Sequence, residues 1–157
     1  MGVSGSGKTS VGRLLAERLG LSYVEGDKEH PQANLKKMAA GIALNDEDRR
    51  VWLQRLEARL AAARAAGSGM VMACSALKRK YRDTLRAGDP DVFFVYLHGS
   101  HALLEERLKH RRGHFMPPSL LDSQLADLEP LQEDESGMQV DVGPTLEEIV
   151  GEILRRG

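Results

Sequence analysis

The residues with the clearest chemical potential stand at the beginning of the chain, in the run MGVSGSGKTS. This run fits G-x-x-x-x-G-K-[ST] at every fixed position, which is the pattern of a phosphate-binding loop. Its glycines let successive backbone N–H groups point into one concavity, and the helix behind it adds its positive end. The lysine can reach the β- and γ-phosphates, and the threonine hydroxyl can hold Mg²⁺. The sequence therefore predicts a nucleotide site formed by Gly2, Val3, Ser4, Gly5, Ser6, Gly7, Lys8, Thr9 and Ser10.

The alternative interpretation of this run is a flexible Gly/Ser segment. The residues behind it argue against that alternative, because Val11, Leu14, Leu15 and Leu19 recur at helical spacing. Gly20 is placed to end this helix. A loop rich in glycine that leads directly into a helix is the context that a phosphate-binding motif requires.

Asp27 is expected at the same edge of the sheet as the loop, because it follows a short strand predicted over 21–24. Ligands of parallel sheets lie at the carboxyl ends of the strands. A carboxylate in this place could orient an acceptor hydroxyl or accept its proton beside a γ-phosphate. The Gly26-Asp27 pair is also typical of an ordinary turn, and its position alone leaves both interpretations open.

Two groups of basic residues follow. Arg49 and Arg50 stand in the first turns of a long helix, where one arginine could turn inward and clamp an anionic substrate. A solvated helix face with local ion pairs is the more usual reason for such charges. The second group follows Ser75, and Lys78 lies nearest to the end of the preceding strand. Lys78 is therefore the member of that group expected to be functional.

A third basic group includes Arg107 and Arg111 and leads into a segment bounded by Gly113 and Pro118. This arrangement suits a lid near residues 107–120 that closes arginines onto the transferring phosphoryl group and excludes water. The alternative is a surface loop with a basic flank.

The elements that must position these residues alternate along the chain. Strands are predicted over 21–24, 70–74, 92–97 and 138–142, and helices over 33–40, 45–66, 78–86, 101–111 and 119–129. Thr145 is placed to cap a last helix. This alternation predicts an α/β fold in three layers, with a parallel sheet and helices on both faces. The length of 157 residues favours a single domain over 1–157.

Composition excludes several other classes. The net charge of −1 and the aromatic content of 4% argue against nucleic-acid binding. No apolar run reaches membrane-spanning length and no signal peptide opens the chain, so a cytoplasmic location is expected. The single Cys74 excludes internal disulfides. His98 and His101 do not form a metal site, because no third ligand lies near them in the sequence.

Four stretches together resemble the gluconokinases, which belong to the shikimate/adenylate kinase-like branch of P-loop kinases. The stretches are MGVSGSGKTSVG, EGDKEHPQANLKKMAAGIALNDEDRRVWL, ACSALKRKYRDTLR and RLKHRRGHFMPPSLLDSQLADLEP, and they extend to about Pro130. The first is common to many NTPases, and the others are specific. The resemblance implies transfer of phosphate from ATP, with Mg²⁺, to the terminal hydroxyl of D-gluconate. It also implies a five-stranded parallel sheet, often in a homodimer.

The resemblance further implies roles for individual residues. The phosphate loop and Arg107 would bind ATP, and Thr9 would hold its magnesium ion. Asp27, His30, Arg49 and Lys78 would bind gluconate, with Asp27 at the reacting hydroxyl. The implied catalytic set is Lys8, Asp27 and Arg111.

One departure from the family pattern concerns the start of the chain. Relatives have an apolar strand before the Met-Gly-Val-Ser run, whereas only Met1 precedes Gly2 here. A shortened chain, an internal start and a real absence of the strand all remain open. Without that strand, segments 70–74 and 92–97 lose a shared neighbour, and each unpaired buried backbone group costs about 1–3 kcal/mol. We therefore expect this form to be weakly stable or poorly active.

Two alternatives to gluconate phosphorylation remain at this point. One is a kinase for another small hydroxy acid or for a nucleoside monophosphate. The other is a nucleotide-binding protein with impaired catalysis, which the departure at the start of the chain makes more plausible.

Overall fold

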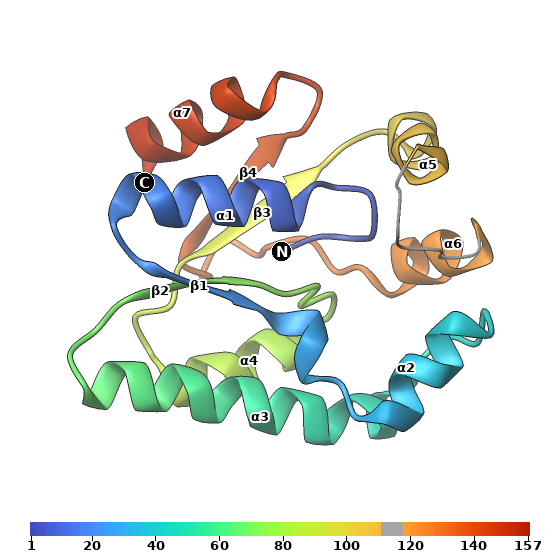
Figure 1. Cartoon of the computed structure of the whole chain (residues 1–157), viewed down its shortest axis with the longest axis horizontal. Coiled ribbons are helices and arrows are strands. Elements are labelled where there is room, and N and C mark those ends of the chain that lie inside the picture. Colours follow the sequence, from blue (N-terminus) through green and yellow to red (C-terminus); the bar gives the residue numbers. More distant parts are fainter. Residues whose placement is uncertain (111–117) are drawn as a thin grey trace.

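The computed structural model describes residues 1–110 and 118–157, and Figure 1 shows their arrangement. The strands are β1 (Ser22–Glu25), β2 (Met70–Ala73), β3 (Phe94–His98) and β4 (Gly137–Asp141). The α-helices are α1 (Lys8–Leu19), α2 (Gln32–Ala39), α3 (Asp46–Ala65), α4 (Arg79–Gly88), α5 (His101–Lys109), α6 (Pro118–Asp127) and α7 (Leu146–Arg156). A 3-10 turn, η1 (Gly26–Glu29), follows β1. Every predicted element is confirmed, with ends that differ by one or two residues.

The ends of the two helices nearest to the site follow from local chemistry. Gly20 closes α1 in a left-handed conformation with φ of 68°. Asn45 begins α3 through a capping box: its side chain accepts a bond from the Asp48 N–H, and the Asp48 carboxylate accepts one from the Asn45 N–H. Gly20 thus ends α1, and the capping box fixes the start of α3, where Arg49 lies.

The strands form two parallel pairs, β1 with β2 and β3 with β4. Helices α1 and α7 cover one face of the strands, and α3 and α4 cover the other (Figure 1). Each face has its own hydrophobic core. The first core includes Val11, Leu15, Val140, Val142, Ile149 and Val150, and the second includes Trp52, Leu53, Leu56, Tyr81, Leu85 and Phe94. The three-layer α/β architecture is thus confirmed.

The single five-stranded sheet implied by the resemblance is not present in the described residues, because β2 and β3 are not paired with each other. Met1 and Gly2 bridge them instead. The Met1 amine donates to the Val95 carbonyl at 2.5 Å, the Leu97 N–H donates to the Met1 carbonyl at 2.9 Å, and the Gly2 N–H donates to the Ser75 carbonyl at 3.2 Å. Burial lowers the pKa of the Met1 amine to about 5.

A cavity of about 630 Å³ separates the remaining edges of β2 and β3. Its lining is mainly apolar and includes Met1, Val71, Met72, Phe94, Val95 and Ile153. The cavity therefore occupies the place where a strand running into Met1 would pair with both neighbours.

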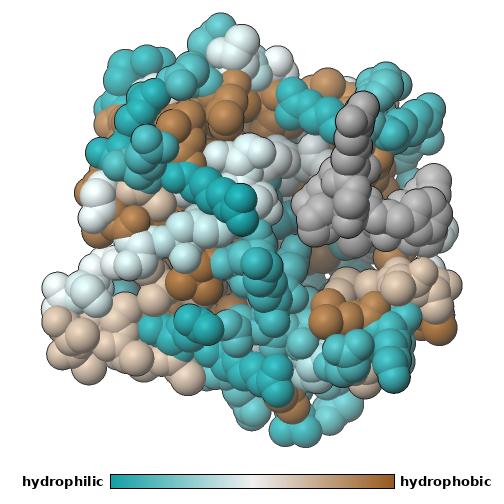
Figure 2. Space-filling view, in the orientation of Figure 1, coloured by the Kyte–Doolittle hydropathy of each residue, from teal (hydrophilic) through white to brown (hydrophobic). Residues whose placement is uncertain are grey.

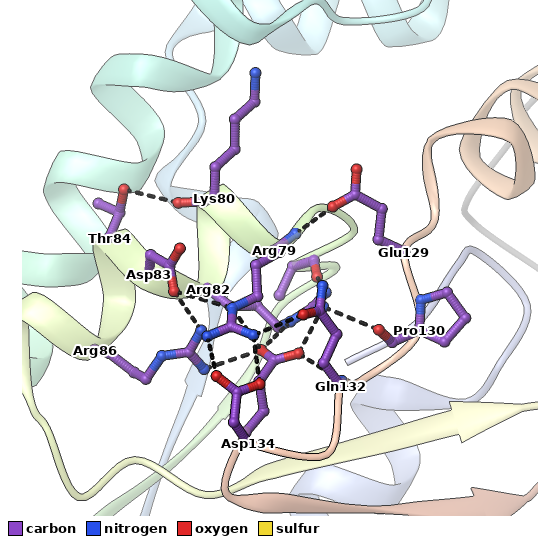
Figure 3. Close-up of polar contacts among 12 residues, drawn as sticks. Arg79, Lys80, Arg82, Asp83, Thr84, Arg86, Glu129, Pro130, Gln132 and Asp134 are labelled. Atoms are coloured by element: carbon purple, nitrogen blue, oxygen red, sulfur yellow. Dashed lines mark hydrogen bonds and ion pairs between the residues drawn. The ribbon is translucent and has the colours of Figure 1, made fainter.

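A buried ion pair anchors α4 to the segment that follows α6. The Arg82 and Glu135 side chains are both fully buried, with Nε and Oε1 2.7 Å apart. The Arg82 guanidinium also donates to the carbonyls of Ala76 and Leu77, which lie in the loop before α4. Around this pair Arg79 donates to Asp134, and Arg86 donates to both Asp83 and Glu135 (Figure 3). The network fixes the loop that joins β2 to α4.

Figure 2 shows hydrophobic and hydrophilic residues side by side over α7, and hydrophilic residues over part of α3. In residues 1–110 and 118–157 no helix combines the length and the apolar character that a bilayer crossing needs.

Candidate functional site

The loop before α1 has the geometry of a phosphate cradle. Gly2, Gly5 and Gly7 adopt φ values of 144°, 83° and 90°, which other residues rarely adopt. A Cβ atom on Gly2 would lie 2.7 Å from the Leu97 carbonyl oxygen, and one on Gly5 would lie 2.8 Å from that of Leu104. These positions therefore require glycine, both for the turn and for close packing against β3 and α5.

Polar groups gather over this loop. The Lys8 ammonium donates to the Val3 carbonyl at 3.1 Å, so the lysine folds back across the loop. The Ser4 N–H donates to Gln124 Oε1 of α6 at 2.7 Å. The Ser6 hydroxyl is buried without a hydrogen-bond partner among the described residues. A glycine-rich loop that brings a lysine ammonium and backbone N–H groups together at the start of a helix is suited to binding an anion.

Beside the loop, Thr9 meets a carboxylate at the end of β1. The Thr9 hydroxyl and the Tyr23 hydroxyl both donate to Glu25 Oε2 at 2.7 Å. Burial and the Glu25 carboxylate raise the pKa of Tyr23, which keeps it a donor. Glu25 Oε1 is buried and has no hydrogen-bond partner among the described residues. Oxygen ligands of this kind fit Mg²⁺, a hard cation that keeps phosphate and water ligands besides one or two protein groups.

A cleft of about 760 Å³ brings most of the predicted residues together. Its lining includes Ser4, Gly5, Gly7, Lys8, Thr9, Ser10, Asp27, His30, Arg49 and Arg107, together with Glu25, Ser123 and Gln124. Arg107 Nη2 donates to the Val142 carbonyl at 2.5 Å, which holds the guanidinium at the cleft wall. Residues of α2, α5 and α6 line the cleft, and these helices lie at one end of the molecule (Figure 1).

Among the predicted residues that the structure describes, four do not line this cleft, namely Gly2, Val3, Ser6 and Lys78. Lys78 does not line this cleft, because its ammonium pairs with Asp46 Oδ1 at 3.1 Å. Arg111 and half of the predicted lid, residues 111–117, lie outside the described residues. Among the described residues no group of three His, Cys, Asp or Glu side chains could hold a metal by itself.

The choice between Arg49 and Arg50 is settled by burial. The Arg49 side chain is 8% exposed, whereas that of Arg50 is 58% exposed and pairs with Glu47. Arg49 Nη1 donates to the Tyr81 hydroxyl at 2.8 Å and to Asp127 Oδ2 at 3.3 Å. Arg49 is thus the arginine that turns inward, and it presents a permanent positive charge to the cleft.

His30 is the second buried polar group of this wall. Its ring stacks on Trp52 with the centroids 4.3 Å apart and the planes inclined by 13°. Burial, helped by the Arg49 charge, lowers the pKa of His30 to about 4. The imidazole is therefore neutral at neutral pH.

Glu25 and Gln124 are residues of the site that sequence reasoning missed. The predicted strand over 21–24 ends one residue before Glu25, whereas β1 extends through Glu25 to the edge of the sheet. An acidic residue directly after a strand and close to Asp27 was a usable signal. Gln124 carried no such signal, because its approach to Ser4 depends on how α6 folds over the loop.

The phosphate cradle, the parallel strands and the basic cleft define a P-loop kinase of the small-molecule type. The family model described as shikimate kinase matches residues 4–156. A probable gluconokinase of Xenopus tropicalis is 45% identical over 98% of this chain and 88% of its own length. The thermoresistant gluconokinase of Escherichia coli is 41% identical over 100% of this chain and 92% of its own.

A solved structure leads to the same family. The crystal structure of a gluconokinase from Sinorhizobium meliloti superimposes with a TM-score of 0.90 at 50% identity, over 99% of this chain and 87% of the other. The chain belongs to the gluconokinase family, within the shikimate kinase-like kinases.

Proposed function

We propose that this protein catalyses the transfer of the γ-phosphoryl group of ATP to the terminal hydroxyl of D-gluconate, which gives 6-phospho-D-gluconate and ADP. The observation that carries the proposal is that the phosphate loop and the buried Arg49 line one cleft together with Asp27. One end of such a cleft suits a triphosphate, and the other suits a small anion that carries hydroxyl groups. The gluconokinase relatives support the choice of gluconate.

The nucleotide side of the cleft consists of the phosphate loop, Lys8 and Arg107. Backbone N–H groups of the loop would bind the phosphate oxygens, and Lys8 would move from the Val3 carbonyl to the β- and γ-phosphates. Thr9 would hold Mg²⁺, with Glu25 beside it as a direct or water-bridged ligand. When bound with ATP, this ion neutralises part of the charge that develops on the phosphoryl oxygens.

The acceptor side uses residues from η1 and α3. Arg49 would bind the gluconate carboxylate, because a buried guanidinium provides a charge and several donors in a fixed plane. Asp27 would orient the terminal hydroxyl and take its proton. The hydroxyl oxygen then forms the new bond to phosphorus while the bond to the β–γ bridging oxygen breaks. Lys78 would join this side only if it exchanged Asp46 for the substrate.

We also propose that residues 1–157 form a single domain, with a lid near 107–120 that brings Arg111 to the phosphoryl group. We further propose a cytoplasmic location and a homodimer. Positioning and charge stabilisation would supply most of the catalysis, as they do in other phosphoryl transfers.

The test is an ADP-release assay with ATP and Mg²⁺ in which gluconate, shikimate and AMP are offered separately. We expect turnover that saturates with gluconate and is absent with the other two acceptors. Lys8→Ala, checked for folding by circular dichroism, should lose about 100-fold or more in kcat. Turnover with shikimate or AMP alone would assign another substrate. ATP binding without any turnover would favour a nucleotide-binding role.

A further inference from the structure

The buried amide of Asn34 connects His30 to the backbone of α3. Asn34 lies on α2, one helical turn after His30, and is 4% exposed. Its Nδ2 atom lies 2.7 Å from the Asp48 carbonyl oxygen and 3.2 Å from His30 Nδ1. One –NH₂ group carries two hydrogens, so it can serve both contacts at once.

These two contacts define the state of the imidazole. A backbone carbonyl oxygen only accepts hydrogen bonds, so the Asn34 atom that faces Asp48 must be the nitrogen. The same nitrogen then donates to His30 Nδ1, which must be the unprotonated ring atom. The proton of the neutral ring is therefore on Nε2. An imidazolium would place an N–H against the Asn34 donor, so this contact disfavours it.

The surroundings hold this arrangement in place. Trp52 supports the plane of the ring, and its own Nε1 donates to the Gly26 carbonyl at 2.8 Å. The Asp48 side chain is held by Lys37 at 2.7 Å and by the cap of α3, which fixes the carbonyl behind it. The charge of the Arg49 guanidinium on α3 acts on the ring, and the ion pair of Asp48 with Lys37 lies behind the Asn34 amide.

We propose that Asn34 is a positioning residue that keeps His30 neutral with its proton on Nε2, so that the ring donates a hydrogen bond to an oxygen of the hydroxy acid in the cleft. This inference deepens the proposed function and depends on it for the identity of the ligand. Arg49 would then recognise the charge of the substrate, and His30 would recognise a hydroxyl group without adding a second charge.

The first test does not require activity. The ¹⁵N chemical shifts of the His30 ring are measured in the unliganded protein from pH 5.5 to 8. We expect a neutral ring with Nε2 protonated throughout this range. A ring protonated on Nδ1, or one that becomes doubly protonated near pH 6.5, would overturn the inference even if gluconate turnover were normal. A neutral His30 ring with Nε2 protonated, in a protein that shows no turnover of gluconate, would instead count against the proposed function.

The second test uses Asn34→Asp, which keeps the shape of the side chain and replaces the donor with an acceptor. The His30 proton should move to Nδ1, or the ring should become charged. We expect the KM for gluconate to rise about tenfold while the KM for ATP changes less than about twofold. Lys37→Met is the matched control, because it alters the neighbouring ion pair on α2 and leaves the amide intact. It should preserve the ¹⁵N pattern.

A double-mutant cycle separates positioning from a general structural effect. His30→Gln keeps a donor near the place of Nε2 but has no tautomer for Asn34 to select. In that background, Asn34→Asp should change the KM for gluconate less than about twofold. An equal rise in the wild-type background and in the His30→Gln background would mean that Asn34 acts only through the fold, which would overturn the proposal.

Discussion

At the scale of single residues, the Glu25 carboxylate is the buried acid with the clearest possible function. Glu25 accepts hydrogen bonds from Thr9 and Tyr23 on one oxygen and has no partner among the described residues on the other. A buried carboxylate oxygen without a partner is costly in free energy, so such an atom usually has a function. Its place beside the motif threonine makes binding of Mg²⁺, directly or through water, the use that best fits its chemistry.

Replacing Glu25 tests this use. Glu25→Gln should raise the Mg²⁺ concentration needed for half-maximal turnover about tenfold, because supporting ligands of a metal contribute about 10–100-fold to affinity. Titration of activity with Mg²⁺ at saturating ATP measures the effect. Glu29→Gln is the control, because Glu29 lies on the same turn but pairs with Arg59 and does not line the cleft. Identical Mg²⁺ curves for the wild type and Glu25→Gln would exclude the role.

The lowered pKa of His30 predicts how stability depends on pH. The folded protein binds the His30 proton near pH 4, whereas an unfolded histidine binds it near pH 6.5. The unfolded state therefore holds more protons between these values, and stability falls as the pH drops through this window. The loss amounts to about 3 kcal/mol at pH 4. His30→Phe keeps the stack on Trp52 and should remove this part of the pH dependence, measured by urea unfolding at pH 7 and pH 4.5. If the free energy of unfolding fell equally in the wild type and in His30→Phe between pH 7 and pH 4.5, the lowered pKa of His30 would be contradicted.

At the scale of elements, the fully buried Arg82–Glu135 pair fixes α4 and the loop before it. Arg82→Met should cost about 3–5 kcal/mol in the free energy of unfolding, because it removes the fully buried partner of the Glu135 charge and leaves that charge to Arg86, whose side chain is 21% exposed. The exposed pair of Arg18 and Glu147 gives the control, and Arg18→Met should cost less than about 1 kcal/mol. Urea unfolding compares the two variants. If both variants lost less than about 1 kcal/mol in the free energy of unfolding, the buried pair would not anchor α4.

Most of the elements could be predicted because their signals are local. The capping box at Asn45 and the glycine at position 20 determine helix ends within a few residues of themselves. The sequence could not decide between Arg49 and Arg50. The answer depends on which arginine contacts Tyr81 and Asp127, and both of these residues are distant in the sequence. The division of the strands into two pairs is non-local in the same way. The state of His30 also depends on Asp48, which lies on another helix.

At the scale of the whole molecule, a cavity lies between β2 and β3. In the described part of the chain each of these strands has a partner strand on one side only, and their facing edges border about 630 Å³ of mainly apolar space. Backbone groups without partners and unfilled apolar volume both lower stability. A strand that runs into Met1 would join the two pairs into one five-stranded sheet.

Extending the chain tests this interpretation. Adding about six to ten apolar, β-forming residues before Met1 should fill the cavity and raise the melting temperature by more than about 5 °C. A Gly/Ser extension of equal length is the control and should have little effect, because it adds no apolar side chains. Equal melting temperatures for the apolar extension and the original chain would show that the cavity does not accept a strand.

The most direct measurement of the central claim is the proton-coupled ³¹P NMR spectrum of a reaction that contains the protein, ATP, Mg²⁺ and gluconate. Transfer to the terminal hydroxyl places the phosphoryl group on a CH₂ carbon, so we predict a new phosphomonoester signal split into a triplet, together with ADP. A doublet would place the phosphoryl group on a secondary hydroxyl. Inorganic phosphate alone, or no change in the ATP signals, would contradict the account.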